Sequence, residues 1–524
     1  MFSRSVSISL VVFACASAFA QTAKFEITEA HVTPKVIANP YMEVTPPHDG
    51  RYEFHSASMI DLIQEAYGFP SDKILGGPSW LEMDRFEIIA KVPAGTKETP
   101  PPGSQPGAIS DAVKEMLKSA LADRFKLVIR EETKPLPGYA LTVDKKPQMK
   151  EGDGSGNTGC RFVPPTNPAD GSDAALMRFS CKNMTMEALA AFLPGFLGRV
   201  GVTDKTELRG QWNFDLKWSR SASPQAAADE IGKQLGLKLE SQPIPTPVIT
   251  VVSVNKAPTP NAPGAAEALP PTPEPNAFDA ATIKPTDPDY EGGSTFGRQS
   301  PSLWGGRGAF LNTLLVRAFS PSFITRNDDL VVGMPGWAST ARYDITGRQP
   351  SGSSASARLA PMLLTLLEER LKLKWHTEER PVSVYVLTAA KSKLKKADPT
   401  SRTHCLRGQP PAGSPLNAVS VICQNMTIEQ FGDEIRRTLP GPGSPVLDGT
   451  GLEGGWDFAF TFVYPRVAVD PSAPASVAPT ASDPDGGMPI IEALDKQLGL
   501  KLETRKRPMM VTVIDHVEQT PTDN

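Results

Sequence analysis

One eight-residue string limits what this chain can fold into. KQLGLKLE occupies residues 233–240 and again residues 496–503. Identity over a string of this length is not expected by chance in a chain of 524 residues. The repetition therefore indicates that one structural module occurs at least twice along the chain.

Two longer patterns recur in the same order. The pattern G-x-P-x-W places Trp80 in the first copy and Trp337 in the second. The pattern V-x-D-x-T-x-L-x-G-x-W occurs at 202–212 and at 446–456. It gives matched acids and tryptophans, namely Asp204 with Asp448 and Trp212 with Trp456. Self-similarity at so many fixed spacings predicts an internal tandem duplication into two lobes.

Each lobe also reads as two smaller units. In the first unit, Ser58 can cap a helix, an alternating strand covers 85–92, and a second helix follows. Two short strands, 126–133 and 139–143, are expected to close this unit. The second unit repeats the order and is expected to close with strands at 237–242 and 248–254. In the last unit, Thr427 and Gln430 form a capping box.

These patterns predict the fold class. We expect an α+β protein with two tandem lobes, each of two small helix-over-mixed-sheet sandwich units in α-β-α-β-β order. The repeated string then ends a helix and starts a strand, and Gly236 and Gly499 take the left-handed turn between them. The expected ranges are 1–20 for a signal peptide, 21–255 for lobe one, 256–276 for a proline-rich linker and 277–520 for lobe two. The expected units cover about 25–145 and 180–255 in lobe one, and about 277–391 and 423–518 in lobe two.

The N-terminus predicts export. Arg4, an apolar run and Ala18-Phe19-Ala20 form a signal peptide cleaved after Ala20, which implies a periplasmic or secreted protein. A lipoprotein anchored through Cys15 is the alternative. No later apolar run reaches the roughly 18–20 residues needed to span a bilayer. The net charge of −4, with both signs interspersed, gives no electrostatic argument for binding nucleic acid.

Four cysteines remain after the signal peptide. They form two local pairs, and an even number in an oxidising compartment predicts the disulfides Cys160–Cys181 and Cys405–Cys423. Metal ligation is the alternative, but no CxxC motif or matching histidine spacing supports it.

The sequence predicts no catalytic, cofactor-binding or metal-binding residue. No two of the six histidines stand at i, i+4, and nucleophile-elbow and phosphate-binding glycine motifs are missing. His376 lies near Glu378 and Glu379, which is compatible with a dyad or with a solvated strand face. Asp204 and Asp448 are interpreted as turn residues that bond backbone groups, with a catalytic role as the alternative.

The four matched tryptophans admit two interpretations. They can anchor the cores of their units, or they can form an exposed aromatic ledge for a peptide or a sugar.

Several segments resemble a secreted protein family of unknown function that is abundant in soil Acidobacteria. The likeness rests on FDAATIKP, GGPSWLEMDRFEI, VLDGTGLEGGWDF and the closing EALDKQLGLKLETRKRPMMVTVIDHVE, and it covers nearly the whole chain as two copies. No activity is established for that family. Some of its members are joined to membrane metallopeptidase-type sensor proteins, which implies extracytoplasmic sensing.

The last half-unit contains NMTIEQFGDEIRRTL, WDFAFTF, IIEALDKQLGLKLE and MMVTVI in this order. In this order of helices and strands, the half-units are similar to the short periplasmic domain at the N-terminus of secretins and TonB-dependent transducers. That similarity implies docking of a protein partner. Together these observations predict a non-catalytic envelope protein that binds a partner, with strand addition as one mode. Two alternatives stay open: an envelope hydrolase with a site between the lobes, and a sensor of a small ligand or glycan. The oligomeric state is left open.

Overall fold

The computed structural model describes most of the chain. The described residues are 23–33, 42–102, 108–164, 176–198, 200–219, 222, 224–270, 275–300, 302–319, 330–350, 359–389, 391–408, 410–411, 414, 418–436, 445–463 and 487–522. The expected signal peptide, with Cys15 and Ala20, lies outside them.

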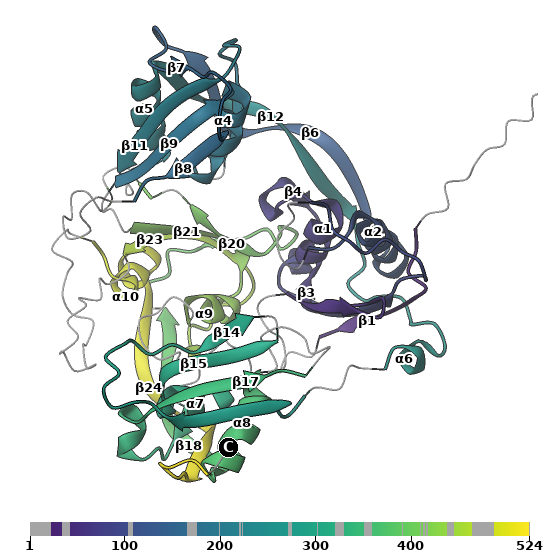
Figure 1. Cartoon of the computed structure of the whole chain (residues 1–524), viewed down its shortest axis with the longest axis vertical. Helices are drawn as coiled ribbons and strands as arrows, with labels where there is room; N and C mark the ends of the chain where they lie inside the picture. Colours follow the sequence, from purple (N-terminus) through teal and green to yellow (C-terminus); the bar gives the residue numbers. More distant parts are fainter. Residues whose placement is uncertain are drawn as a thin grey trace, which may run out of the picture.

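The chain is an α+β protein with two lobes and a hydrophobic core in each of four units (Figure 1). Units 1 and 2 form lobe one, and units 3 and 4 form lobe two. The described residues make six four-stranded sheets. None of the described helices is long and apolar enough to cross a membrane.

Lobe one contains the elements β1 to β12. Those of unit 1 are β1 (Ile27–Val32), β2 (Glu43–His48), β3 (Arg51–Ser58), α1 (Met59–Tyr67), β4 (Ile74–Gly76), β5 (Arg85–Lys91), α2 (Asp111–Phe125) and β6 (Val128–Val143). Those of unit 2 are β7 (Lys150–Glu151), β8 (Gly159–Phe162), β9 (Leu176–Met184), α4 (Met186–Phe192), β10 (Gly201–Asp204), β11 (Trp212–Ser219), α5 (Pro224–Leu235) and β12 (Leu237–Ser253).

Lobe two repeats this order. Unit 3 has β13 (Ala280–Pro285), β14 (Gly297–Ser300), β15 (Leu303–Phe310), α7 (Leu311–Ala318), β16 (Val331–Val332), β17 (Arg342–Arg348), α8 (Leu359–Arg370) and β18 (Lys374–Ala389). Unit 4 has β19 (Lys395–Lys396), β20 (His404–Gly408), β21 (Ala418–Met426), α9 (Ile428–Arg436), β22 (Val446–Asp448), β23 (Trp456–Val463), α10 (Ile490–Ala493), a π-helical turn (Leu494–Leu498) and β24 (Leu500–His516).

One antiparallel sheet in each unit follows a common strand order. The orders are β1-β5-β3-β2, β7-β11-β9-β8, β13-β17-β15-β14 and β19-β23-β21-β20. Alternation decides which face is buried. In β5, Phe86 and Ile88 enter the core with the helices, whereas Glu87 between them points to the opposite face. The sequence predicted at most one strand before the first helix of each unit, whereas the structure has three strands there.

The expected pairs of short closing strands are wrong. Each pair is one continuous strand, and β6 and β12 pair with each other over their whole length as an antiparallel ribbon between units 1 and 2 (Figure 1). The far end of β12 adds Ile249 and Val251 to the core of unit 1, while β6 adds Tyr139 and Leu141 to the core of unit 2. The two units of a lobe therefore exchange strands.

Lobe two makes the same exchange. Strands β18 and β24 form the second ribbon. Ile514 of β24 joins the core of unit 3, and Leu387 of β18 joins the core of unit 4. A parallel strand flanks each end, so that the two ribbon sheets have the orders β10-β6-β12-β4 and β22-β18-β24-β16. Strand exchange is thus a property of the repeated module.

Prolines explain why a turn was expected and why none forms. The ribbon of lobe one pairs Pro137 with Pro243 and Pro135 with Pro245. Leu141 lies an even number of residues beyond both prolines of β6, and its carbonyl accepts a hydrogen bond from Lys205, directly after the flanking strand β10. Because alternate residues of a strand direct their backbone groups to the same side, the prolines also direct theirs outward from the ribbon. Because proline has no N–H, it fits such outward positions without breaking the pairing. The ribbon therefore passes straight through the Pro-Leu-Pro-Gly segment.

Caps fix the ends of the helices as the sequence indicated. Ser58 caps α1, with Asp61 completing the capping box, and the side chains of Thr427 and Gln430 exchange hydrogen bonds with each other's backbone N–H at the start of α9. Gly236 and Gly499 both have a φ of +69°. A Cβ at either glycine would collide with the backbone carbonyl of Lys146 or Lys391, so only glycine fits this joint.

The linker is more ordered than its proline content suggests. The side chain of Asn261 accepts hydrogen bonds from the backbone of Ala30 in β1 and from Arg124 in α2. A short helix, α6 (Ala265–Ala268), follows and contacts β1, and Ala265 and Leu269 are buried. The described part of the linker thus covers the open edge of β1.

Candidate functional site

All four units share a polar joint at the end of the strand before the first helix. One residue there has a positive φ: Ser56, Asn183, Gly308 and Asn425. In each unit its backbone N–H donates to a side-chain oxygen on the neighbouring strand. The acceptors are Glu87, Asn213, Asp344 and Asp457, and the N–O distances lie between 2.8 and 3.0 Å. The acceptor is therefore part of the scaffold.

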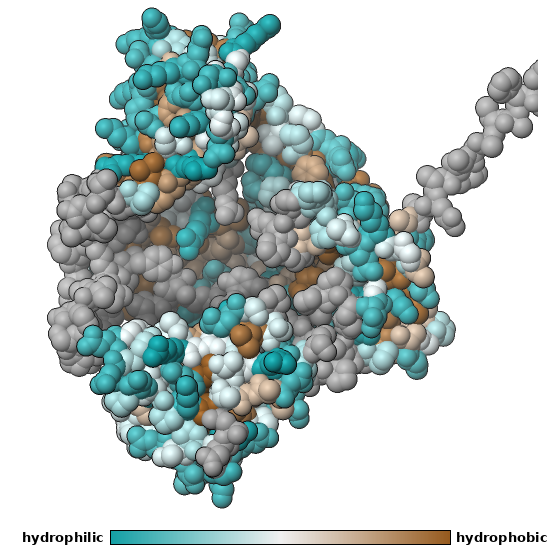
Figure 2. Space-filling model, viewed as in Figure 1, coloured by the Kyte–Doolittle hydropathy of each residue, from teal (hydrophilic) through white to brown (hydrophobic). Residues whose placement is uncertain are grey.

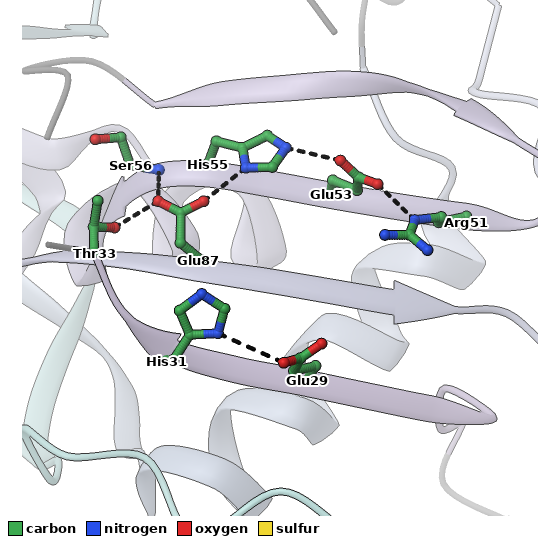
Figure 3. A network of polar contacts seen from close by, with 8 residues as sticks. All are labelled: Glu29, His31, Thr33, Arg51, Glu53, His55, Ser56 and Glu87. Carbon is green, nitrogen blue, oxygen red and sulfur yellow. Dashed lines mark hydrogen bonds and ion pairs between the residues drawn. The ribbon is translucent and has the colours of Figure 1, made fainter. Parts of the chain in front are cut away.

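Unit 1 builds a charged network on this joint (Figure 3). His55 lies between two carboxylates, with its Nδ1 2.6 Å from Glu87 and its Nε2 2.8 Å from Glu53. Glu53 is only 1% exposed and also binds Arg51 Nε at 2.5 Å. Thr33 donates its hydroxyl to Glu87 at 2.6 Å. Four alternating charges thus lie on the sheet face opposite the helices.

The network keeps His55 protonated. Burial opposes the charge, but the hydrogen bonds and charges of Glu53 and Glu87 outweigh it and raise the pKa of His55 to about 9. In return, the hydrogen bonds from His55, Thr33 and Ser56 hold the pKa of Glu87 below its usual range despite its burial. At neutral pH the site is a set of paired ions.

Protonation decides what chemistry this site can do. A general base needs a free lone pair near neutral pH, and a metal ligand needs a neutral ring nitrogen. Both ring nitrogens of His55 instead donate to carboxylates. Among the described residues, no group of three or more His, Cys, Asp or Glu side chains is arranged to hold a metal ion. The network is therefore an ionic clamp between β3 and β5.

A second histidine has a carboxylate partner in lobe two. His376 Nδ1 lies 2.9 Å from Asp515, across the ribbon, and its Nε2 lies 3.7 Å from Glu378. The hydrogen bond to Asp515 raises the pKa of His376. The side chain is 47% exposed, and the sequence did not indicate Asp515 as its partner. This arrangement agrees with a solvated strand face.

Unit 2 carries an aromatic cluster at one edge. Phe179 stacks on Trp218 with ring centres 5.6 Å apart and lies within 5.8 Å of Phe162, Phe192 and Phe196. Phe179 and Trp218 are buried, but Phe162 is 45% exposed and the adjacent Val163 37% exposed. Phe192 and Phe196 are partly buried. The cluster therefore presents apolar surface beside β8.

Unit 4 has a different surface at the same positions. Matching the two disulfides places Arg407 where unit 2 has Phe162. Matching the helix caps Thr185 and Thr427 places Glu434 where unit 2 has Phe192. The aromatic edge is thus a property of unit 2 and is not required by the shared fold.

A family model described as "Protein of unknown function (DUF3738)" matches residues 60–254 and 318–517. Together these segments cover more than half of the chain. The protein belongs to the DUF3738 family. The search of curated proteins and the search of solved structures each found no match.

Each DUF3738 match covers most of one lobe and starts after the lobe's first three strands. The first runs from α1 to the end of the β6–β12 ribbon, and the second from the end of α7 to the end of β24. Each matched segment consequently includes both strands of the ribbon that joins the two units of a lobe. A single unit is only part of it, because its core is completed by a strand from the other unit.

The matched acids of the two DUF3738 copies have the same surroundings. Asp204 accepts from Thr206 N at 2.8 Å, and Asp448 accepts from Thr450 N at 2.8 Å. The threonine hydroxyls accept in turn from Leu208 N and Leu452 N. Both acids thus fix a turn before β11 or β23.

The tryptophans of the two copies are anchored in their units. Trp80 and Trp337 follow the G-x-P turn and pack against the cores of units 1 and 3. Trp212 and Trp456 start β11 and β23 and pack against the cores of units 2 and 4. All four are partly buried. A groove of about 230 Å³ beside α8 is lined by Phe278, Met362 and Leu366 among others, and none of these tryptophans lines it.

Both DUF3738 copies contain one disulfide. Cys160–Cys181 joins β8 to β9, and Cys405–Cys423 joins β20 to β21. Each ties an edge strand to its neighbour. Loops of this size stabilise a fold by about 3 kcal/mol each in the chain-entropy model.

Sequence reasoning missed the ionic clamp of unit 1. Arg51, Glu53 and His55 alternate along one strand, and this spacing places all three on one face. That signal was available in the sequence. The contribution of Glu87 was not, because it comes from a strand that is distant in sequence.

Proposed function

We propose that this protein is a non-catalytic docking protein of the cell envelope. Two disulfides favour an oxidising compartment, and export through a signal peptide cleaved after Ala20 belongs to the proposal. The proposal also includes kinship with secreted proteins of soil Acidobacteria. It further includes the docking role that the likeness to the short domain of secretins and TonB-dependent transducers implies.

The aromatic edge of unit 2 is the observation that carries the proposal. Aromatic side chains that are partly exposed on a packed support are the usual anchors of protein interfaces. Phe179 and Trp218 hold the more exposed rings in place from below. Figure 2 shows hydrophobic residues at the lower margin of the unit drawn at the top, near β8 of Figure 1. The partner is expected to insert an apolar side chain among Phe162, Phe192 and Phe196.

The ribbon edge of lobe one does not favour strand addition. Five prolines, at 135, 137, 243, 245 and 247, occupy positions whose backbone groups face outward from the paired strands. Each removes one donor that an added strand would need. Side-chain anchoring therefore fits the structure better than the strand addition that the sequence suggested.

Exchanging residues between matched units tests the proposal. The double variant Phe162→Arg and Phe192→Glu copies unit 4 onto unit 2. A photo-crosslinking residue at Val163 in the exported full-length protein should join to one partner, and the double variant should lose at least about nine-tenths of that product, because truncated aromatic anchors commonly cost more than 2 kcal/mol.

The matched control removes apolar surface from unit 4. Leu406→Ser and Ile422→Ser change side chains that are 44% and 50% exposed on a pair of adjacent strands. This control should crosslink like the unchanged protein. Equal crosslinking by the Phe162 and Phe192 double variant, with both disulfides formed, would exclude the aromatic edge as the docking site.

A further inference from the structure

Among the described residues, a charged contact joins unit 4 of lobe two to unit 1 of lobe one. Arg402 lies in the loop before β20 of unit 4, and its Nη2 is 2.8 Å from Glu82 Oε1 in unit 1. Its Nη1 donates to the backbone carbonyl of Ile74. The next residue, Thr403, donates its backbone N–H to Ser79 O at 3.1 Å. The arginine and glutamate side chains are only 12% and 22% exposed, so water screens this ion pair weakly.

Unit 4 holds its side of the contact rigid. Asp398 accepts from Thr400 N at 2.9 Å and closes a tight turn. Asn425, the residue with positive φ, donates through Nδ2 to Ser401 O at 2.6 Å and accepts at its carbonyl from the Thr403 hydroxyl. The disulfide at Cys405 follows directly. Arg402 is therefore presented from a preorganised loop.

Unit 1 is equally well supported on its side. Ile74 lies in β4, which pairs with the ribbon strand β12. Glu82 follows the short 3₁₀ helix Ser79–Leu81, whose Trp80 packs edge-on against Phe86 with ring centres 5.9 Å apart. Both partners thus meet as prebuilt surfaces, which reduces the entropy lost when they bind.

The duplication supplies an internal comparison. Unit 2 has a similar loop, in which Asp153 bonds Ser155 and Asn183 bonds the Ser155 carbonyl, but Asn157 stands in the place of Arg402. Unit 3 has the G-x-P-x-W turn, but Ser339 stands in the place of Glu82. Of these four positions, only Arg402 and Glu82 carry opposite charges, and these two contact each other.

We propose that Arg402 and Glu82 form a specific latch that sets how lobe two sits on lobe one. The neutral counterparts, Asn157 and Ser339, leave the loop of unit 2 and the turn of unit 3 without this charge match. The duplication gave units 2 and 4 similar loops and units 1 and 3 similar turns. The opposite charges of Arg402 and Glu82 therefore select the contact between the loop of unit 4 and the turn of unit 1.

Cleavage of the linker in the full-length chain tests the latch. A protease site placed between residues 270 and 275 is cut after purification, and the two halves are followed by gel filtration and by their dissociation constant. The halves of the unchanged protein should stay together. Glu82→Arg or Arg402→Glu should weaken their association at least ~10-fold, because each places like charges in a poorly hydrated contact. The double reversal should restore most of the affinity.

Controls separate the latch from general effects. Ser339→Arg and Asn157→Glu introduce the same charged residues at the counterpart positions and should leave the halves associated. If a reversal fails to fold, Glu82→Ser and Arg402→Asn, which copy the counterparts, replace it. Separation of the unchanged halves after cleavage, or single variants that associate normally, would overturn the proposal, as would a folded double reversal without recovery.

Discussion

Unit 1 and unit 3 hold the same position in their lobes but use it differently. In both, an acid on the middle strand accepts from the backbone of a residue with positive φ: Glu87 from Ser56, and Asp344 from Gly308. In both, the threonine directly after the first strand donates to that acid. Unit 1 adds His55 and the buried Glu53. Unit 3 has Arg307 and Gly305 at those positions.

The difference separates the scaffold from its additions. Arg307 Nε lies 3.7 Å from Asp344 and is 57% exposed, so this ion pair contributes little. His55 is 22% exposed and has a carboxylate on each ring nitrogen. A histidine between two acids resembles a catalytic group when viewed alone. The comparison with unit 3 shows that Glu87 first serves the backbone, and that His55 extends this structural role.

The largest predicted effect tests the strand exchange, which units 1 and 3 share. A chain of residues 21–145 lacks β12 and with it Ile249 and Val251 of the unit 1 core, so it should show no cooperative thermal unfolding by circular dichroism. A chain of residues 21–270 should unfold cooperatively. The equivalent pair in lobe two, 275–391 and 275–524, should behave in the same way. Cooperative folding of either short chain would show that its unit does not need the exchanged strand.

The next largest effect tests the pairing of His55 with Glu53 and Glu87, which unit 1 has and unit 3 lacks. Folding raises the pKa of His55 from 6.5 to about 9 because Glu53 and Glu87 favour the cation. This stabilisation is fully present below pH 6.5 and is lost as pH rises through about 9. The loss amounts to about 3 kcal/mol, and urea unfolding at about pH 6 and about pH 10 should measure it.

Two variants isolate the contribution of His55. His55→Gln removes the titrating group and should abolish the pH-dependent difference. His55→Arg copies the cation of unit 3 and should also remove it, since arginine stays charged throughout this range. An undiminished pH dependence in both variants would assign it to other groups.

The smallest effect concerns the helix that follows the joint. Ser58 caps α1 through a 3.0 Å bond from Asp61 N, whereas the corresponding Phe310 makes no side-chain cap at α7. Ser58→Ala should lower the free energy of unfolding by about 1 kcal/mol. Ser119→Ala, at a solvated position of α2, serves as a control in the same unfolding assay. A cost for Ser58→Ala no larger than for the control would mean that Asp61 and its partner Arg85 hold the helix start without the hydroxyl.

Much of the fold could be predicted because its signals are local. Apolar spacing placed α1, α2 and β5, the cysteine pairs gave the disulfides, and Gly236 marked a left-handed joint. The closing strands were mispredicted because Pro135, Pro137 and Gly138 together are typical of a turn. Outward-facing positions in a ribbon accept the same prolines, and only pairing with a strand about a hundred residues away distinguishes the two outcomes.

The sequence alone determined that one module was copied, where its helices begin and end, and which cysteines pair. Tertiary structure alone decided that units complete each other's cores, that Glu87 meets His55, and that Arg402 reaches Glu82. The physical reason is the range of the forces. Backbone propensity and capping act within a few residues, whereas burial and ion pairing depend on which distant segments come together when the chain closes.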